Sequence, residues 1–411
     1  MLTIKQWEQQ MSILSERAKN VRLSQTARVA NLAIEKQLAG ERIINFSVGE
    51  PEYKTPENIC TAGIKSIQEG KGKYTATGGL KSLKSAIRDK FKNDNGLIFS
   101  EDQTIVCNGG KQVIFNALLS TLNEGDEVII PAPYWTSYPE MVKLCGGTPV
   151  IVPTKIDNNF KLTAQDLSNA ITKNTKWVII NSPSNPTGAT YKKHELILLS
   201  KVLHQHEKIY ILSDDIYEKI IYGNNQFCNF SQISANFFSR TLIVNGLSKS
   251  HGMTGWRLGY GAGPIEIISS MHEIQSQSTS NACSISQYAG LEALTSTSNE
   301  FISKKIQNYE SLKNLVVHHL NENIGVNCPE PQGAFYVFPC IKQLIGTKTK
   351  TGHRINNDED FAYHLLVQNG EAVGPGSSFG YSDNFRISYA ITEKTLLEGC
   401  DQIKKFISSL K

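Results

Sequence analysis

Six short apolar runs, separated by segments with helical spacing, constrain the fold of this 411-residue chain more than any other feature. They are continuously apolar rather than alternating, which is typical of strands buried on both faces of a mostly parallel sheet. One intervening segment keeps helical spacing from Val113 to Leu122 and stops at Gly125. The pattern predicts an α/β fold whose ligands collect at the carboxyl ends of the strands. The predicted strands are 104–107, 127–130, 149–152, 176–180, 209–212 and 241–244.

The pattern changes after about residue 295. A long helical stretch over 300–323 precedes strand signals at 333–338 and 385–389, with further helices over 359–368 and at the C-terminus. The polar run 347–354 is typical of a solvated loop. This order predicts a second, smaller α+β domain that the N-terminal segment joins. We expect 1–53 to form that segment with part of the small domain, 54–300 the large domain, and 301–411 the rest of the small domain.

Composition and charge argue against several classes of protein. The formal net charge of +4 is small for a chain of this length, so nothing indicates a nucleic acid or a membrane surface as partner. No apolar run approaches the roughly 20 residues that span a bilayer, and the N-terminus lacks the apolar core of a signal peptide. The eight cysteines show no CxxC spacing, so we expect buried free thiols in a reducing cytoplasm and no metal site.

A lysine, Lys249, follows the last predicted strand in the run Gly-Leu-Ser-Lys-Ser-His-Gly-Met-Thr-Gly-Trp-Arg-Leu-Gly, which spans 246–259. Its amine can condense with an aldehyde, and Arg257, eight residues later, can hold a phosphate through two parallel bonds. A lone lysine after a strand is usually a surface residue. An amine with a phosphate anchor is what a protein needs to hold pyridoxal 5′-phosphate covalently, so the pair predicts this cofactor.

The run 246–259 resembles the cofactor-lysine signature of the class I aminotransferases that depend on pyridoxal 5′-phosphate. A second run, Asn-Ser-Pro-Ser-Asn-Pro-Thr-Gly at 181–188, resembles the SPxNPTG motif of the same family. The resemblance extends from Arg22 to the C-terminus, and it is nearest to the bacterial aspartate aminotransferases that include aspartate/prephenate aminotransferases. It implies fold type I, with a large domain around a mostly parallel sheet, a smaller α+β domain and a homodimer.

The resemblance implies which residues bind the cofactor. Asp214, three residues before Tyr217, would pair with the ring nitrogen, and Asp215 ranks below it for this role. Tyr217 and Asn185 would contact the phenolic oxygen. Tyr74 would reach the phosphate from the neighbouring subunit, so each active site would be shared between two subunits. The residues expected to bind the cofactor are Tyr74, Gly109, Gly110, Lys111, Trp135, Asn185, Asp214, Tyr217, Ser248, Lys249 and Arg257.

The resemblance also implies how a substrate is held. The planar guanidinium of Arg386 would take the α-carboxylate through two charge-assisted bonds, helped by the backbone of Gly49. The stretch 275–282 has no arginine for a distal carboxylate, so Lys111 would pair with that group instead. The alternative for Lys111 is an exposed lysine at the start of a helix. The residues expected to contact substrate are Arg22, Thr26, Gly49, Lys111, Trp135, Asn185 and Arg386.

These residues predict an aspartate aminotransferase that passes the amino group of L-aspartate to 2-oxoglutarate, with Lys249 as the general base of a ping-pong cycle. The first alternative is an aromatic or prephenate aminotransferase, because prephenate also presents a second carboxylate. A β-lyase acting on cysteine conjugates is a second alternative. A non-catalytic binding protein on the same scaffold is disfavoured, since the lysine, the ring aspartate and the carboxylate arginine are all present.

Overall fold

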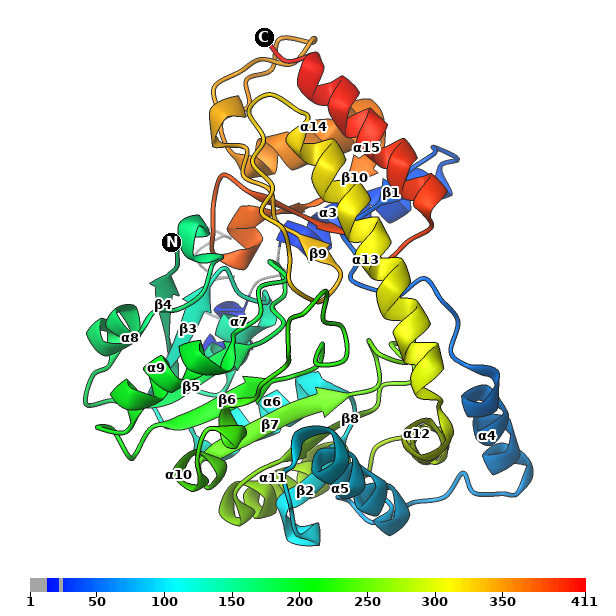
Figure 1. The fold of residues 1–411 in the computed structure, drawn as a ribbon, viewed down its shortest axis with the longest axis vertical. Coiled ribbons are helices and arrows are strands. Elements are labelled where there is room, and N and C mark those ends of the chain that lie inside the picture. Colours follow the sequence, from blue (N-terminus) through cyan, green and yellow to red (C-terminus); the bar gives the residue numbers. More distant parts are fainter. Residues whose placement is uncertain (1–12, 22–24) are drawn as a thin grey trace, which may run out of the picture.

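The central sheet of the molecule lies in the lower half of Figure 1. The computed structural model describes residues 13–21 and 25–411, and in this part of the chain the sheet has seven strands. They run in the order β2-β8-β7-β6-β5-β3-β4, and all neighbours are parallel except β8, which is antiparallel to β2 and β7. The strands are β2 (Thr104–Cys107), β3 (Glu127–Ala132), β4 (Thr148–Pro153), β5 (Thr175–Asn181), β6 (Tyr210–Asp214), β7 (Thr241–Gly246) and β8 (Gly259–Ala262).

All six predicted strands form, and two features of the sheet differ from the prediction. β8 has the sequence Gly-Tyr-Gly-Ala, which carries no apolar run that would indicate a strand. Its glycines are required, because a Cβ at Gly261 would lie 2.7 Å from Val113 and one at Gly259 would strike the backbone of Gly110. β4 is not buried on both faces as expected, since it lies at the edge of the sheet and exposes Ile151.

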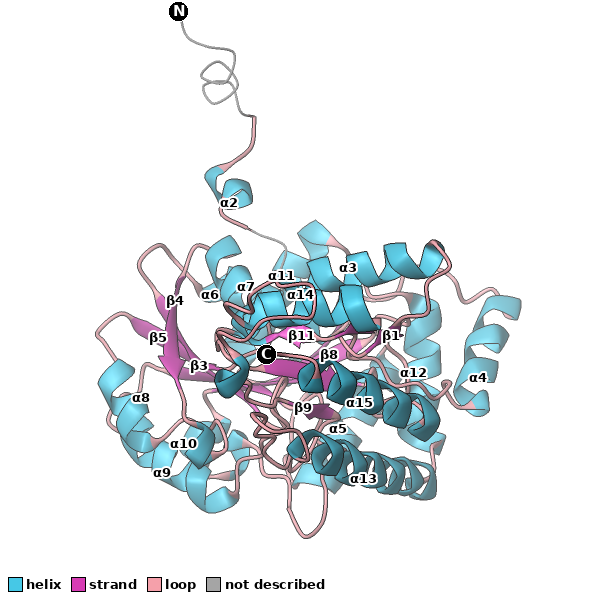
Figure 2. Ribbon diagram, turned by 90° about the horizontal axis from the view of Figure 1, so that it is seen from above, coloured by secondary structure: helices cyan, strands magenta, loops and turns pink. Residues whose placement is uncertain are grey.

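Helices cover both faces of the central sheet (Figure 2). Successive side chains of a strand point to opposite faces, so Ile105 and Cys107 join one core cluster while Val106 joins another. Helices α6, α7 and α11 pack on the first face, and α5, α9, α10 and α12 on the second. The helices around the sheet are α4 (Glu57–Gln68), α5 (Lys81–Asn95), α6 (Gly110–Thr121), α7 (Ser137–Leu144), α8 (Ala164–Ala170), α9 (Lys193–Leu203), α10 (Ala235–Phe238), α11 (Ile265–Ser278) and α12 (Ser284–Ser296).

A second core lies above the central sheet in Figure 1 and packs long helices on small sheets. The three-stranded sheet has the order β11-β12-β9, and β1 of the N-terminal segment pairs with β10. The predicted strand at 333–338 forms only the two residues of β9. The elements are α2 (Glu16–Lys19), α3 (Gln25–Leu38), β1 (Ile44–Asn45), α13 (Asn299–Asn321), β9 (Tyr336–Val337), α14 (Asp358–Asn369), β10 (Glu371–Ala372), β11 (Gly374–Pro375), β12 (Phe385–Ser388) and α15 (Glu393–Ser408).

The cysteines follow the expected pattern with one clear departure. They are free, and Cys107, Cys145, Cys228, Cys328 and Cys400 are buried. Cys283 is exposed, because it occupies the position just before α12, so the expectation of a buried thiol is wrong there. Among the described residues, no helix is long and apolar enough to cross a membrane, and no three His, Cys, Asp or Glu side chains gather around a point where a metal could bind.

Candidate active site

A cavity of about 410 Å³ lies where β5, β6 and β7 end, between the central sheet and the second core. This is the edge at which open α/β sheets bind ligands. Twelve of the residues expected from the sequence line it: Thr26, Gly49, Gly110, Lys111, Trp135, Asn185, Asp214, Tyr217, Ser248, Lys249, Arg257 and Arg386. The cavity therefore brings together residues that are far apart in the sequence.

Lys249 lies in the loop after β7 and projects its amine into the cavity. The Nζ atom donates a 2.8 Å hydrogen bond to the carbonyl oxygen of Gly49, and the Tyr53 hydroxyl donates to the carbonyl of Lys249 itself at 2.8 Å. Burial and the nearby cations Arg386 and Arg257 together lower the pKa of the amine to about 8, against the opposing effect of the carboxylates of Glu50 and Asp214. A lysine with such a pKa supplies a neutral, nucleophilic amine near physiological pH.

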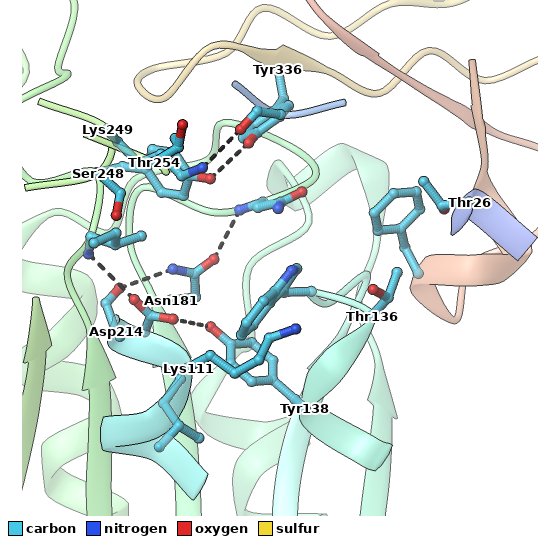
Figure 3. Close-up of a pocket in the computed structure, with 18 of the residues that line it drawn as sticks. Thr26, Lys111, Thr136, Tyr138, Asn181, Asp214, Ser248, Lys249, Thr254 and Tyr336 are labelled. Carbon is cyan, nitrogen blue, oxygen red and sulfur yellow. Dashed lines mark hydrogen bonds between the residues drawn. The ribbon is translucent and has the colours of Figure 1, made fainter. Parts of the chain in front are cut away.

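Asp214, the last residue of β6, presents a buried carboxylate to the cavity. Tyr138 bonds this carboxylate, whereas the side-chain amide of Asn181 donates to the main-chain carbonyl of Asp214 (Figure 3). The Tyr138 hydroxyl donates to Oδ2 at 2.6 Å, the backbone N–H of Ile216 donates to Oδ1 at 3.3 Å, and Asn181 bonds the carbonyl at 2.9 Å. Burial raises the pKa of Asp214 to about 6, although the hydrogen bond from Tyr138 counteracts it.

Asp215, the second candidate for the ring nitrogen, does not face the cavity. Its carboxylate accepts hydrogen bonds from the Ser213 hydroxyl at 2.7 Å and from the Asn229 amide at 2.7 Å, both of which are buried. Successive residues of an extended chain point in opposite directions. The sequence favours Asp214 over Asp215, and the structure shows that of the two carboxylates only that of Asp214 faces the cavity.

The turn from β2 into α6 forms a cradle for an anion. Gly109 has a φ of 84°, and a Cβ there would lie 2.5 Å from the guanidinium of Arg257, so only glycine fits. Helix α6 begins at Gly110, and the first N–H groups of a helix have no partner inside it. Arg257 is fixed by a 2.8 Å hydrogen bond from Nη1 to the carbonyl of Thr254.

Lys111 and Trp135 lie together on one wall of the cavity. The Nζ atom of Lys111 is 4.9 Å from the centroid of the Trp135 ring, and the Tyr138 ring meets that indole edge-on at 5.3 Å. Burial and the neighbouring Arg257 lower the pKa of Lys111. No salt bridge of Lys111 occurs within the described residues, so its amine can pair with a ligand carboxylate.

Arg386, on β12, is a buried guanidinium between two aromatic rings. Its Cζ atom lies 4.8 Å from the Tyr336 ring and 4.9 Å from the Phe379 ring. Nη1 donates to Oδ1 of Asn185 at 2.9 Å, and Nη2 donates to the carbonyl of Ser47. Its buried Nε has no hydrogen-bond partner within the described residues. A buried cation without a carboxylate partner suits an anionic ligand.

Two of the expected residues that the structure describes do not line this cavity. Gly109 lies beneath the Arg257 guanidinium and shapes the cradle without facing it. Tyr74 is 90% exposed and lies outside the cavity of its own chain. Arg22 lies outside the described residues. Thr26 does line the cavity, and its buried hydroxyl has no hydrogen-bond partner within the described residues.

The cavity also contains residues that the sequence did not point to. Tyr138, Asn181, Thr254, Tyr336 and Phe379 all line it. Tyr138 carried a signal, because it lies one helical turn after Trp135 and so on the same side of the chain. Asn181 opens the run that contains Asn185. Tyr336 and Phe379 gave no local signal, because they reach the cavity only through the packing of the second core against the sheet.

Comparison with known proteins identifies the family. A family model for aminotransferases of class I and II matches residues 41–403. The chain belongs to the class I and II aminotransferases. This aminotransferase is therefore an enzyme that transfers amino groups, and the family expected from the run around Lys249 is confirmed.

Relatives of this aminotransferase match it over nearly its whole length. An aspartate/prephenate aminotransferase of Cereibacter sphaeroides is 50% identical over 400 residues, which is 97% of this chain and 100% of that protein. The crystal structure of an aspartate aminotransferase from Rhizobium meliloti has a TM-score of 0.94 at 41% identity, covering 97% of this chain and 100% of that one. An aspartate aminotransferase from Thermus thermophilus with maleate has a TM-score of 0.90 at 35% identity, covering 96% and 100%. The expected α/β fold with a mostly parallel central sheet is confirmed.

Proposed function

We propose that the cavity binds pyridoxal 5′-phosphate. Three features of the cavity fit this group. Asp214 is a buried carboxylate that forms no ion pair within the described residues, and a protonated ring nitrogen supplies the missing charge. The start of α6 with Arg257 suits the phosphate. The amine of Lys249 has the lowered pKa that an aldehyde partner needs.

The orientation of Asn185 adds support for this assignment. Arg386 has only donors, so the atom of Asn185 that it bonds must be the amide oxygen. The Asn185 amide nitrogen is then available to donate to the phenolic oxygen of the cofactor, together with the hydroxyl of Tyr217. Trp135 forms the wall against the ring, and Gly109, Gly110, Lys111 and Ser248 lie along the phosphate side.

In the proposed mechanism, Arg386 binds the substrate α-carboxylate through a bidentate pair and so orients the Cα–H bond. Pyridoxal 5′-phosphate supplies an aldehyde that takes up the amino group and a ring that stores an electron pair. The amine of Lys249 would act as the general base that accepts the proton from the substrate Cα atom and as the acid that gives it back. Asp214 keeps the ring nitrogen protonated, because a buried carboxylate stabilises the adjacent positive charge.

We propose L-aspartate as amino donor and 2-oxoglutarate as acceptor. The observation that carries this proposal is that Lys111 and Arg386 line the same cavity as Lys249, and that neither cation has a carboxylate partner within the described residues. A dicarboxylate satisfies both cations, whereas a neutral amino acid leaves Lys111 unpaired. The names of the relatives, aspartate and aspartate/prephenate aminotransferases, support the same substrate class. Gly49, Thr26 and Arg22 are proposed as further substrate contacts.

A half-reaction tests this proposal. L-Aspartate alone is added to the purified protein loaded with pyridoxal 5′-phosphate, and the visible spectrum is recorded. We expect the yellow absorbance to be lost, to return on addition of 2-oxoglutarate, and to respond far less to L-alanine at the same concentration. A spectrum that responds equally to both amino acids, or only to cysteine conjugates with release of pyruvate, would overturn the substrate assignment.

Prephenate is the second candidate substrate, favoured by the name of the Cereibacter relative and by its second carboxylate. Its ring-borne carboxylate offers Lys111 the same charge that the aspartate side chain does. The acceptors prephenate and phenylpyruvate, which differ in that carboxylate, separate the two possibilities. Preference for prephenate that disappears in Lys111→Met indicates a dual-specificity enzyme, whereas equal use of both acceptors indicates an aromatic aminotransferase.

We propose that the enzyme acts as a homodimer with shared sites, because Tyr74 is 90% exposed and outside its own cavity. Subunits carrying Tyr74→Ala and Lys249→Ala, unfolded together and refolded, test this. Random pairing gives half hybrids, each with one intact site, so roughly a quarter of wild-type activity should return. No recovery would mean that Tyr74 serves its own subunit, and full activity of Tyr74→Ala alone would mean that it serves no active site.

We also propose the division into 1–53, 54–300 and 301–411, with α13 linking the sheet to the second core. Limited proteolysis should then cut first near the ends of α12 and α13. A cytoplasmic location is proposed on the free, mostly buried cysteines, which suit a reducing compartment.

A further inference from the structure

Two tyrosine hydroxyls meet beside the cavity, and each is a donor and an acceptor. The hydroxyls of Tyr217 and Tyr336 lie 2.7 Å apart, and both residues line the cavity. Their side chains are 3% and 1% exposed. Neither hydroxyl bonds any other atom within the described residues. One proton therefore fills the shared bond, and the other is left over and must point elsewhere.

The direction of the hydrogen bond between the two tyrosines decides whether the Tyr217 hydroxyl can donate its proton to a ligand in the cavity. If Tyr217 donates to Tyr336, its only proton is used and its oxygen can merely accept. If Tyr336 donates, the proton of Tyr217 is free to point into the cavity. The proposed function needs the second arrangement, because a phenolic oxygen that carries negative charge requires a donor. The following inference rests on that function and deepens it.

The surroundings of Tyr336 favour it as the donor. The guanidinium of Arg386 lies 4.8 Å from the Tyr336 ring, and a cation over a phenol ring makes its O–H more acidic. Burial raises the pKa of Tyr336, but Arg386 lowers it again. Burial, Tyr336 and the Asp214 carboxylate keep the pKa of Tyr217 well above its usual value, although Arg386 lowers this pKa as well. The more acidic of two hydroxyls is the better donor.

Tyr336 also has no freedom to turn away. It belongs to β9, where it is in register with Ser388 of β12, two residues beyond Arg386. Its hydroxyl approaches Gly49 so closely that a Cβ at that position would strike it. The carbonyl of Gly49 in turn accepts from the amine of Lys249 at 2.8 Å. One side chain thus contacts Arg386, Tyr217 and the loop residue Gly49, whose carbonyl accepts from the lysine.

We infer that Tyr336 is a positioning residue that donates its hydroxyl proton to Tyr217 and so directs the Tyr217 proton into the cavity, toward the phenolic oxygen of the cofactor. Because its ring packs on Arg386, the same residue links the group that binds the substrate carboxylate to the group that polarises the cofactor. Hydrogen bonds in such a chain strengthen one another, so Tyr217 is a better donor with Tyr336 behind it than alone.

The sign of one spectroscopic shift tests this inference. The visible absorbance of bound pyridoxal 5′-phosphate changes with pH, and the pH at half of this change is called the midpoint below. A hydrogen-bond donor at the phenolic oxygen lowers the midpoint, because it stabilises the deprotonated form of the bound cofactor. Tyr217→Phe removes a charge-assisted donor and should raise the midpoint by about 1–2 pH units. Tyr336→Phe keeps the ring on Arg386 and should raise it by roughly a quarter of that amount, since it removes only the cooperative part.

A matched control exists in the same core. The Tyr389 hydroxyl donates to the Tyr222 hydroxyl at 3.0 Å, both residues are buried, and neither lines the cavity. Tyr389→Phe should leave the midpoint unchanged. A second probe avoids any loss of packing: 3-fluorotyrosine at position 336 is a stronger donor and should lower the midpoint.

Each outcome decides between the two bond directions. A lower midpoint in Tyr336→Phe would show that Tyr336 takes the proton of Tyr217, and an unchanged midpoint would show that it only packs; either overturns the inference. If Tyr217→Phe leaves the midpoint unchanged, the proposed role of Tyr217 fails and the inference falls with it. If Tyr217→Phe raises the midpoint while Tyr336→Phe does not, only the inference fails.

Discussion

The two ends of the cavity are built differently. Around Asp214, the carboxylate is buried and held by Tyr138 and the backbone of Ile216, and the neighbouring Asn181 fixes the chain. Around Lys111, the amine rests against one indole ring and forms no salt bridge within the described residues. Figure 3 shows Asp214 and Lys249 on one side and Thr26 on the other.

This difference assigns catalysis to the part of the cavity around Asp214 and substrate selectivity to the part around Lys111. A group held by several buried bonds keeps one position, which is what proton transfer and charge stabilisation require. A flexible lysine adapts to ligands of different length, which is what a dicarboxylate pocket for more than one substrate requires. We therefore expect substitutions at the buried end to affect all substrates equally, and substitutions at the open end to affect only those with a second carboxylate.

The largest effect should follow Lys249→Ala. Loss of the group that moves the proton should lower kcat by about 10⁴-fold with every amino acid, the upper range for a general base. Steady-state rates with L-aspartate and L-alanine measure this, with Lys193→Ala, an exposed lysine at the start of α9, as control. More than a hundredth of wild-type activity in Lys249→Ala would contradict the assigned role.

Asp214→Asn should have the next largest effect. Removing one member of a buried charge pair costs about 3–5 kcal/mol, which corresponds to a fall of roughly 150- to 5,000-fold in kcat/KM for all substrates alike. Dialysis should also remove pyridoxal 5′-phosphate from this variant faster than from the wild type. Asp215→Asn is the matched comparison, since that carboxylate faces away from the cavity. Asp215→Asn should lower the stability of the fold but leave cofactor retention unchanged. If Asp215→Asn lost the cofactor and Asp214→Asn kept it, Asp215 and not Asp214 would be the residue that pairs with the ring nitrogen.

The buried amine of Lys249 should also lower the free energy of unfolding near neutral pH. The pKa of Lys249 is depressed to about 8 in the cofactor-free protein, so the charged form is penalised at neutral pH, and stability is gained as pH rises from 8 toward the unfolded value. Lys249→Met should therefore stabilise the cofactor-free protein at pH 7, with a ceiling of about 3 kcal/mol, and this gain should vanish near pH 10.5. Urea unfolding at both pH values measures it. A variant less stable than the wild type at pH 7 would contradict the argument.

At the open end, Lys111→Met should lower kcat/KM for L-aspartate by roughly 10–100-fold, the value of one charge-assisted hydrogen bond. L-Alanine should be used within about twofold of the wild type, because it has no group for Lys111 to bind. Stability should change little, since the residue as a whole is exposed and forms no salt bridge within the described residues. A loss shared by both substrates would instead place Lys111 on the cofactor phosphate.

The sequence predicts the polar residues that follow the strands better than the aromatic residues that surround Arg386. Asp214, Asn185 and Lys249 each follow an apolar strand directly, so their place at the sheet edge follows from periodicity and motif. Tyr336 lies 50 residues before Arg386 in the sequence and Phe379 seven residues before it, and neither carries a local signal, because only tertiary packing places their rings on the guanidinium. The glycine-rich strand β8 is similar, because its form depends on the close approach of α6 and not on its own preference for a strand.

The most direct test of this account is the ratio of kcat/KM for L-aspartate to that for L-alanine, measured side by side in the wild type, Asp214→Asn and Lys111→Met. We expect a high ratio in the wild type, the same ratio in Asp214→Asn despite its much lower rates, and a ratio lowered about 10–100-fold in Lys111→Met. A ratio that falls in Asp214→Asn, or that survives in Lys111→Met, would show that the two ends of the cavity do not divide chemistry and selectivity between them.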